Sequence, residues 1–304
     1  MIVAEVVRSG FVESVHHGIV AVTGRPGVGD VHSPFFPRSS SKPLQTVGLL
    51  DCGLEPREEA DLALISGSHD GDTFHVERVR AMLAAAGLGP EALLCPADLP
   101  LGTAPRNSWL RAGGDAEPIL MNCSGKHAGM LATCVINGWP LDSYLDAKHP
   151  LQLALADAVA ALAGEPIAAV GVDGCGAPVL AISPLALANS FLRLVEAEPG
   201  TPRRRVADAM RAHPQLVAGT GTDDTVLMNS VPGLLTKKGA DGVAAAAIAG
   251  VGAVAIKISD GSARARTPVL LAALRELGVA VPSMDEVVLG GGRPVGEVRA
   301  VPYG

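Results

Sequence analysis

Short apolar runs separated by glycine and proline are the feature of this sequence that most constrains its fold. The 304 residues include 36 glycines and 23 prolines, whereas aromatic residues make up only 3% of the chain. A core with so few aromatics must be built from Ala, Val and Leu, with many turns between short elements. Because 48% of the residues are hydrophobic, such a core can be large. We therefore expect one compact domain over residues 1–304.

The charge balance argues against nucleic acid as a partner. The formal net charge is -7, and neutralising phosphates requires clustered Lys and Arg. No apolar run is long enough to span a membrane, and Glu5 and Arg8 interrupt the region where a signal peptide would be apolar. The five cysteines are odd in number and widely spaced, which favours reduced thiols. We expect a cytoplasmic protein without a nucleic-acid or membrane partner.

Periodicity and turn residues predict an alternation of strands and helices. The first two strands, over residues 2–8 and 18–23, should form a hairpin. Further predicted strands cover residues 166–172, 233–237, 243–248 and 253–259, and helices cover about 74–86, 150–163, 183–196, 202–212 and 267–277. A short apolar run from residue 63 predicts a strand that ends before Ser68. Residues 89–121 are predicted to be loops, and 289–292 to be a glycine-rich tail.

A serine lies three residues before a lysine at the predicted start of a helix. Three residues are almost one helical turn, so Ser39 and Lys42 should share a face of the helix over about residues 38–52. A serine hydroxyl needs a base to become a good nucleophile, and an amine can be that base if its pKa is lowered. The same residues also suit a serine-rich helix cap followed by an exposed lysine. Ser-x-x-Lys therefore needs support from other motifs.

A second serine and a second lysine provide such support. Ser68 is predicted at a strand-to-helix junction, where a hydroxyl lies beside backbone N–H donors, although a plain turn would use the same residues. Lys257 lies in the middle of an apolar strand run. A lysine there is either directed to the sheet edge or buried, and burial would lower its pKa as a catalytic base requires.

The string from Met121 to Leu131 brings metal-binding residue types together. Lys126 and His127 follow Cys123 by three and four residues at a predicted helix start, so the three side chains should converge. Cys175 lies in a turn after a predicted strand. Cysteine and histidine at this spacing, with a second cysteine from elsewhere, suit a Zn²⁺ site, whereas a small buried thiol is the plainer interpretation of Cys123 alone.

Taken together, these motifs resemble one known family. They are Arg38-Ser-x-x-Lys-Pro43, Ser68-His69, Asn122-Cys-Ser-Gly-Lys-His-x-Gly-Met-Leu131, Asp173-Gly-Cys175 and Lys257-Ile-x-Asp-Gly261. In this order they resemble the rhizobial-type, thermolabile L-asparaginases. Residues 217–225 also resemble, superficially, the Gly-Thr-Asp-Thr element of the asparaginases that use threonine nucleophiles, but the Thr-Gly-Gly-Thr element of that family is absent.

The resemblance implies an α/β (α+β) fold with an antiparallel sheet flanked by helices, similar to the serine β-lactamases, and a homodimer. It implies hydrolysis of L-asparagine to aspartate and ammonia. Carried over by motif, two Ser-Lys pairs meet in one site, Ser39 with Lys42 and Ser68 with Lys257. Ser68 with Lys257 is the more attractive attacking pair and Ser39 with Lys42 its proton relay, but which serine attacks stays open.

The family also holds zinc with two cysteines and a lysine, which map to Cys123, Lys126 and Cys175. His127 would then support the ligands or replace one of them. Asp173 is our candidate for binding the α-ammonium group of the substrate, and Arg38 and His69 are further candidates for substrate binding.

Two alternatives remain. A penicillin-recognising serine hydrolase shares Ser-x-x-Lys and a late strand lysine, but Ser-Asp-Asn and Lys-Thr-Gly are absent. A non-catalytic sensor of asparagine or metal would not need lysines with a lowered pKa.

Overall fold

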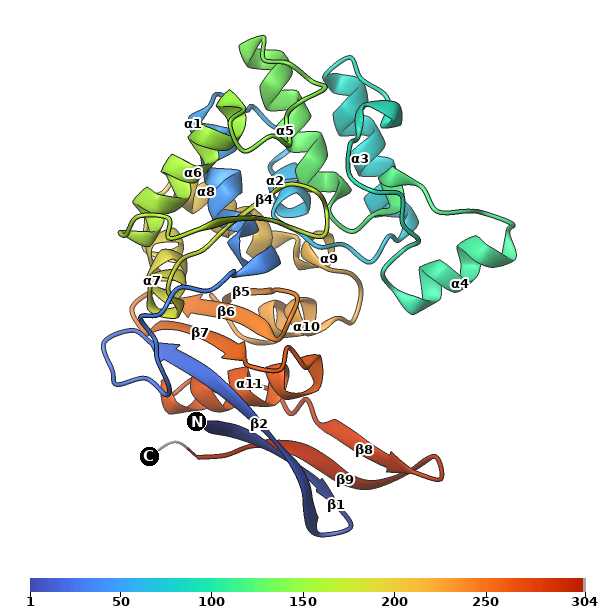
Figure 1. Ribbon diagram of the computed structural model, residues 1–304. Helices are drawn as coiled ribbons and strands as arrows, with labels where there is room; N and C mark the ends of the chain where they lie inside the picture. Colours follow the sequence, from blue (N-terminus) through green and yellow to red (C-terminus); the bar gives the residue numbers. More distant parts are fainter. Residues whose placement is uncertain (303–304) are drawn as a thin grey trace.

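A curled antiparallel sheet runs from the middle of the molecule to one end (Figure 1). The computed structural model describes residues 1–302, and seven strands form the sheet in the order β5-β6-β7-β2-β1-β9-β8. These strands are β1 (Ile2–Arg8), β2 (Phe11–Val22), β5 (Leu235–Lys238), β6 (Val243–Ile248), β7 (Gly252–Ile258), β8 (Glu286–Gly290) and β9 (Arg293–Ala300). A separate hairpin pairs β3 (Val170–Val172) with β4 (Pro178–Leu180). The first and last strands of the chain, β1 and β9, lie side by side (Figure 1).

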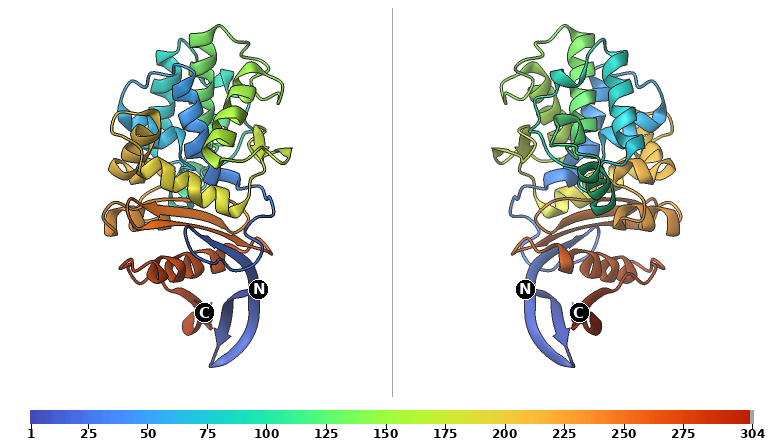
Figure 2. Two further views of the ribbon diagram at one scale, coloured as in Figure 1. Left: turned by 90° about the vertical axis from the view of Figure 1, so that its left-hand side faces the viewer. Right: turned by 90° about the vertical axis from the view of Figure 1, so that its right-hand side faces the viewer.

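Helices cover both faces of this sheet. The α-helices are α1 (Lys42–Asp51), α2 (Glu59–Ile65), α3 (Thr73–Ala85), α4 (Thr103–Arg111), α5 (Ser124–Asn137), α6 (Pro150–Ala163), α7 (Pro184–Val195), α8 (Pro202–Ala212), α9 (Pro214–Val217), α10 (Asp223–Ser230) and α11 (Arg266–Glu276). Short 3₁₀ turns are η1 (Arg38–Ser41), η2 (Pro90–Ala92), η3 (Pro118–Leu120) and η4 (Ala263–Ala265). Most helices gather on one side of β5, β6 and β7, whereas α11 lies on the other side (Figures 1 and 2).

Alternation along the strands divides the apolar side chains between two cores. Ala245 and Ala255 belong to the larger core, which they share with the helices α1 to α8. Val254 and Ile256 belong to the smaller core beneath α11. The small alanines of β6 allow close approach of the covering helices. No helix within residues 1–302 combines the length and apolar character needed to cross a membrane.

The predicted fold class, an antiparallel sheet flanked by helices, is confirmed. Three local predictions are wrong. The run before Ser68 is the helix α2, because a capping box between Glu58 and Asp61 starts a helix there and a short apolar run fits either element. Residues 103–111 form α4 within the predicted loops. The glycine-rich tail is the β8–β9 hairpin, in which Gly291 and Gly292 supply the positive φ of a two-residue turn.

Candidate active site

Ser68 is fixed by close backbone packing in the segment between α2 and α3. A Cβ on the preceding Gly67 would lie 2.8 Å from the carbonyl oxygens of Leu216 and Val217, so only glycine permits this approach. The Ser68 amide donates to the Val217 carbonyl at 2.7 Å. The side chain of Ser68 therefore has a defined position, and the residue is 8% exposed.

Two buried lysines meet at the Ser68 hydroxyl. The Nζ of Lys42, from α1, lies 3.0 Å from Ser68 Oγ, and the Nζ of Lys237, from β5, lies 3.2 Å from it. Lys42 also donates to the Gly67 carbonyl, and Lys237 donates to the Lys238 carbonyl at 2.7 Å. We call Ser68, Lys42 and Lys237 the serine centre.

The electrostatics of the serine centre favour a neutral amine. Burial lowers the pKa of Lys237 to about 7, and the positive charges of Lys42 and Lys238 act in the same direction. The carboxylate of Asp224 opposes this shift. At neutral pH a large share of Lys237 is therefore unprotonated and can accept a proton from the neighbouring hydroxyl.

The structure corrects the lysine predicted to pair with Ser68. Lys257 lies two strands away from β5, on β7, where it pairs with Ile19 and Val243. Its Nζ donates to the Asp241 carbonyl, and its side chain is only half-buried. Burial lowers the pKa of Lys257 as well, but the amine does not contact Ser68. Lys237 takes the place predicted for Lys257.

Lys237 was missed because it precedes another lysine at the end of a strand, which suggests a solvated terminus. The signal that could have identified Lys237 is the two-residue period of a strand. Leu235 and Lys237 share one face of β5, and both are completely buried. Lys238 points to the other face and is half-buried.

The predicted contact between Ser39 and Lys42 is also corrected. Ser39 lies in η1 and is half-buried, and within the described chain its hydroxyl makes no hydrogen bond to Lys42. Instead, Lys42 turns toward Ser68. The next residue of the turn, Ser40, donates from its hydroxyl to the Lys237 carbonyl at 2.9 Å. The turn that carries Ser39 is thus tied to the end of β5.

Arg38 and Asp173 form an ion pair at the outer side of this turn. Arg38 Nε lies 2.7 Å from Asp173 Oδ1, and a second guanidinium nitrogen binds Asp241. Arg38 has a φ of 52°, a backbone conformation that is unfavourable for a non-glycine residue. A surface cavity of ≈ 320 Å³ adjoins this arginine and is also lined by Lys257.

A second buried cluster contains sulfur. Lys126 Nζ donates to Cys175 Sγ at 3.1 Å, and the Cys123 thiol donates to Asn122 Oδ1 at 3.0 Å. The adjacent Cys123 thiol lowers the pKa of Cys175, Lys126 and His127 act in the same direction, and burial opposes them. Although burial opposes it, the two sulfurs raise the pKa of Lys126. We call Cys123, Lys126 and Cys175 the sulfur cluster.

His127 lies at the edge of the sulfur cluster. Its Nδ1 is 2.7 Å from the Tyr144 hydroxyl, while its buried Nε2 has no hydrogen-bond partner within the described part of the chain. Residues 1–302 contain no group of three His, Cys, Asp or Glu side chains that could hold a metal. A metal at this cluster would therefore need Lys126 as well as the cysteines.

His69, a predicted substrate-binding residue, is completely buried. Its Nε2 is 2.8 Å from the Ser124 hydroxyl, and its ring stacks on His75 with centroids 5.0 Å apart. Burial holds the pKa of His69 well below its usual value, so the ring is neutral. Its Nδ1 has no partner among the described residues. A role in substrate binding stays a prediction.

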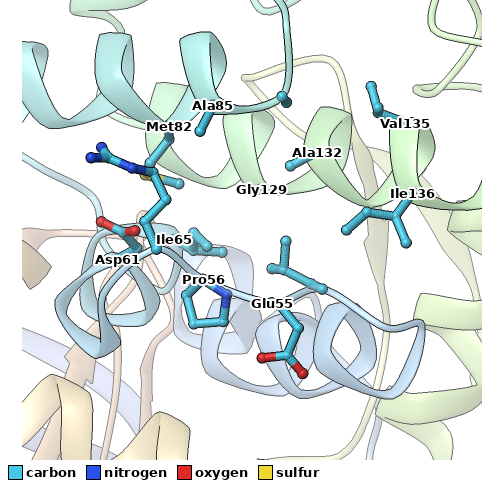
Figure 3. Close-up of a pocket in the computed structure, with 13 residues that line it drawn as sticks. Glu55, Pro56, Asp61, Ile65, Met82, Ala85, Gly129, Ala132, Val135 and Ile136 are labelled. Carbon is cyan, nitrogen blue, oxygen red and sulfur yellow. The ribbon is translucent and has the colours of Figure 1, made fainter.

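An apolar hollow of ≈ 200 Å³ lies elsewhere, between α2, α3 and α5. Figure 3 shows Ile65, Met82, Ala132 and Ile136 around it, with carboxylates only at its margin. The hollow contains no nucleophile paired with a base, so we do not assign the reaction to it.

The fold and the serine centre define a mixed α/β protein in which a buried serine lies between two buried lysines. Comparison of the sequence with family profiles identifies the family. A profile described as L-asparaginase II matches residues 4–300, and the chain therefore belongs to the L-asparaginase II family. This confirms the resemblance drawn from the motifs.

A comparison with curated proteins found no significant match. Among solved structures, the chain is similar to Mglu in its native form, with 15% identity and a TM-score of 0.46 over 86% of this chain and 63% of that chain. A structure of Mglu in 4.3 M NaCl gives 17% identity and a TM-score of 0.44, over 86% of this chain and 60% of that one. The chain thus spans less than two thirds of the length of Mglu.

Proposed function

We propose that this protein hydrolyses L-asparagine to L-aspartate and ammonia through an acyl-enzyme on Ser68. The observation that carries the proposal is the placement of Ser68 Oγ at 3.0 and 3.2 Å from the amines of Lys42 and Lys237. One of these amines has a pKa of about 7. Membership in the L-asparaginase II family supplies the substrate class.

In the proposed reaction, Ser68 Oγ attacks the side-chain amide carbon while Lys237 takes the hydroxyl proton. Lys42 orients the hydroxyl by its hydrogen bond. Lys237 then returns the proton to the leaving nitrogen, ammonia departs, and an ester of aspartate remains on Ser68. Water hydrolyses this ester with the same amine as the base. Because the Ser68 amide already binds Val217, the oxyanion must be stabilised by other donors.

The Arg38–Asp173 pair is suited to recognise an α-amino acid. A carboxylate and a guanidinium 2.7 Å apart are the complements of an α-ammonium and an α-carboxylate, respectively. A zwitterionic substrate would exchange the internal ion pair for two new ones. This supports Asp173 and Arg38 as substrate-binding residues.

The sulfur cluster fits zinc in its donor set. Two sulfurs and the amine nitrogen of Lys126, which must lose its proton to bind a metal, match the preference of zinc for sulfur and nitrogen ligands. We propose that Cys123, Lys126 and Cys175 hold it. Bound zinc would supply positive charge near the serine centre and would cross-link α5 to the β3–β4 hairpin.

The first test is ammonia release from L-asparagine and L-glutamine in parallel, with and without added zinc. The matched control is Ser68→Ala, which removes only the hydroxyl. We expect release from L-asparagine well above L-glutamine, and none above background from the variant. Absence of release from both amides with zinc present would contradict the proposal.

The two alternative functions predict different experimental results. A penicillin-recognising hydrolase would be labelled covalently by a fluorescent penicillin, whereas a sensor would bind L-asparagine in calorimetry without turnover. We also propose a homodimer, which analytical ultracentrifugation tests directly.

A further inference from the structure

We propose that Asp224 is a positioning residue for Lys237: its buried carboxylate fixes the end of β5 and keeps the Lys237 amine beside Ser68. This inference rests on the proposed role of the serine centre. Asp224 lies in residues 217–225, the segment that resembles an element of the asparaginases with threonine nucleophiles. The proposed reaction assigns no role to this segment.

Asp224 holds the backbone of β5 directly. Both of its carboxylate oxygens accept the Lys238 amide at 3.1 Å. On the opposite side, Ser40 binds the Lys237 carbonyl, and a Cβ on Gly239 would lie 2.8 Å from the Pro37 carbonyl oxygen. The strand end is therefore clamped between α10 and η1.

Asp224 also forms a buried ion pair with Lys237. Asp224 Oδ2 lies 3.9 Å from Lys237 Nζ, and the side chains are 2% and 0% exposed. Among the described residues, the ammonium groups of Lys42 and Lys238 lower the pKa of Lys237, and the sulfur of Cys123 raises it as Asp224 does. Asp224 is the one carboxylate in this set. A buried amine without any counter-charge would be driven away from its place or kept permanently neutral.

The neighbouring acid provides a matched control. Asp223 also lies in the first turn of α10, but it accepts hydrogen bonds from Thr267 and Arg266. It therefore faces the start of α11 rather than the serine centre. Substituting either residue removes one negative charge from the same helix turn.

The experiment measures kcat/KM for L-asparagine as a function of pH in wild type, Asp224→Asn and Asp223→Asn, and compares the acidic limbs of the three profiles. Asparagine at position 224 still accepts the Lys238 amide but no longer stabilises the Lys237 ammonium. We expect the limb to move to lower pH by about 1 unit or more, with the Asp223→Asn limb unmoved. A merely structural role would reduce activity without moving the limb, and that result would overturn the proposal.

If wild type releases no ammonia, the proposed function fails. The pH dependence is then measured on the rate at which phenylmethanesulfonyl fluoride sulfonylates Ser68, followed by intact-protein mass. The same shift in Asp224→Asn would support the positioning role without the asparaginase reaction. Absence of labelling of wild-type Ser68 at any pH would overturn it.

A thermal-unfolding cycle keeps the proposal testable should Asp224→Asn fail to fold. Lys237→Met leaves the Asp224 carboxylate buried without its partner. We expect Lys237→Met/Asp224→Asn to have a higher Tm than Lys237→Met alone. An equal or lower Tm of the double variant would overturn the pairing.

Discussion

The serine centre and the sulfur cluster each contain a buried lysine, but their neighbours drive the two amines in opposite directions. Lys237 lies among lysines, and burial lowers its pKa to about 7. Lys126 lies against Cys175, whose sulfur raises the pKa of the amine despite equal burial. Burial therefore does not by itself make a lysine a base. The charge of the nearest neighbours decides whether the amine can accept a proton or instead forms an ion pair.

The largest expected effect separates the chemistry of the two clusters. Ser68→Ala removes the proposed nucleophile, so kcat for L-asparagine should fall by several orders of magnitude. Stability should change little because the backbone contacts of residue 68 remain. Steady-state ammonia assays measure kcat, with a thermal melt as the control for folding. Turnover near the wild-type level would remove Ser68 from the reaction.

The next effect tests whether Lys237 is the base. Lys237→Met keeps the length of the side chain but removes the amine, and general-base catalysis is worth about 10²–10⁴-fold in rate. We expect kcat/KM to fall by that range. Exogenous small amines added to the variant should restore part of the rate, and a loss below tenfold would shift the role to Lys42.

The sulfur cluster should respond mainly in stability. Cys175→Ala leaves the Lys126 ammonium buried without its partner, which costs about 3–5 kcal/mol of unfolding free energy. Urea unfolding of the metal-free protein measures this cost. Cys175→Ala/Lys126→Met removes both partners and should recover a part of it. The single variant Lys126→Met completes the comparison. If the losses of unfolding free energy in Cys175→Ala and Lys126→Met simply added up in the double variant, the proposed pair would not exist.

The pH profile sharpens the contrast between the two amines. Only the neutral form of Lys237 accepts a proton, and its pKa is about 7. Activity should therefore rise with pH through about 7 and fall about tenfold for each unit below it. Measuring kcat/KM across this range gives the apparent value. A limb near the ordinary lysine pKa would mean that Lys237 is no less basic than an exposed amine.

The smallest effect is expected for the lysine that the sequence favoured. Lys257→Met removes a hydrogen bond to the Asp241 carbonyl, which is worth about 0.5–1.5 kcal/mol. The loss of kcat/KM should stay below about tenfold, far from that of Lys237→Met. Parallel kinetics of the two variants compare them, and equal losses would restore Lys257 to the proposed mechanism.

Much of the fold followed from sequence because its signals are local. The helices α6, α7 and α8 begin with proline after a capping residue, and such signals do not depend on the rest of the chain. The capping box of α2, between Glu58 and Asp61, lies before the apolar run and does not by itself exclude a strand after it. Three apolar residues fit a strand or a helix, and the packing of α2 against α8 and α5 stabilises the helix.

The candidate site was predictable to the same extent. Motifs with fixed spacing, Ser39 to Lys42 and Cys123 to His127, identified the segments that converge. They did not identify the partners within the site, because Lys42 reaches Ser68 across 26 positions of the chain. Contacts between distant segments depend on strand register, which no local spacing contains.

The sequence by itself determined which residue types were available for a site: the candidate nucleophiles Ser39 and Ser68, lysines in apolar runs, and cysteines close to a lysine and a histidine. Only the tertiary structure decided that Lys237 rather than Lys257 lies at Ser68. Both lysines occupy apolar strands, and both point to the face of the sheet beneath the helices. The order β5-β6-β7 places one of them next to Ser68 and the other two strands away, because a sheet fixes position through pairing between strands that are distant in sequence.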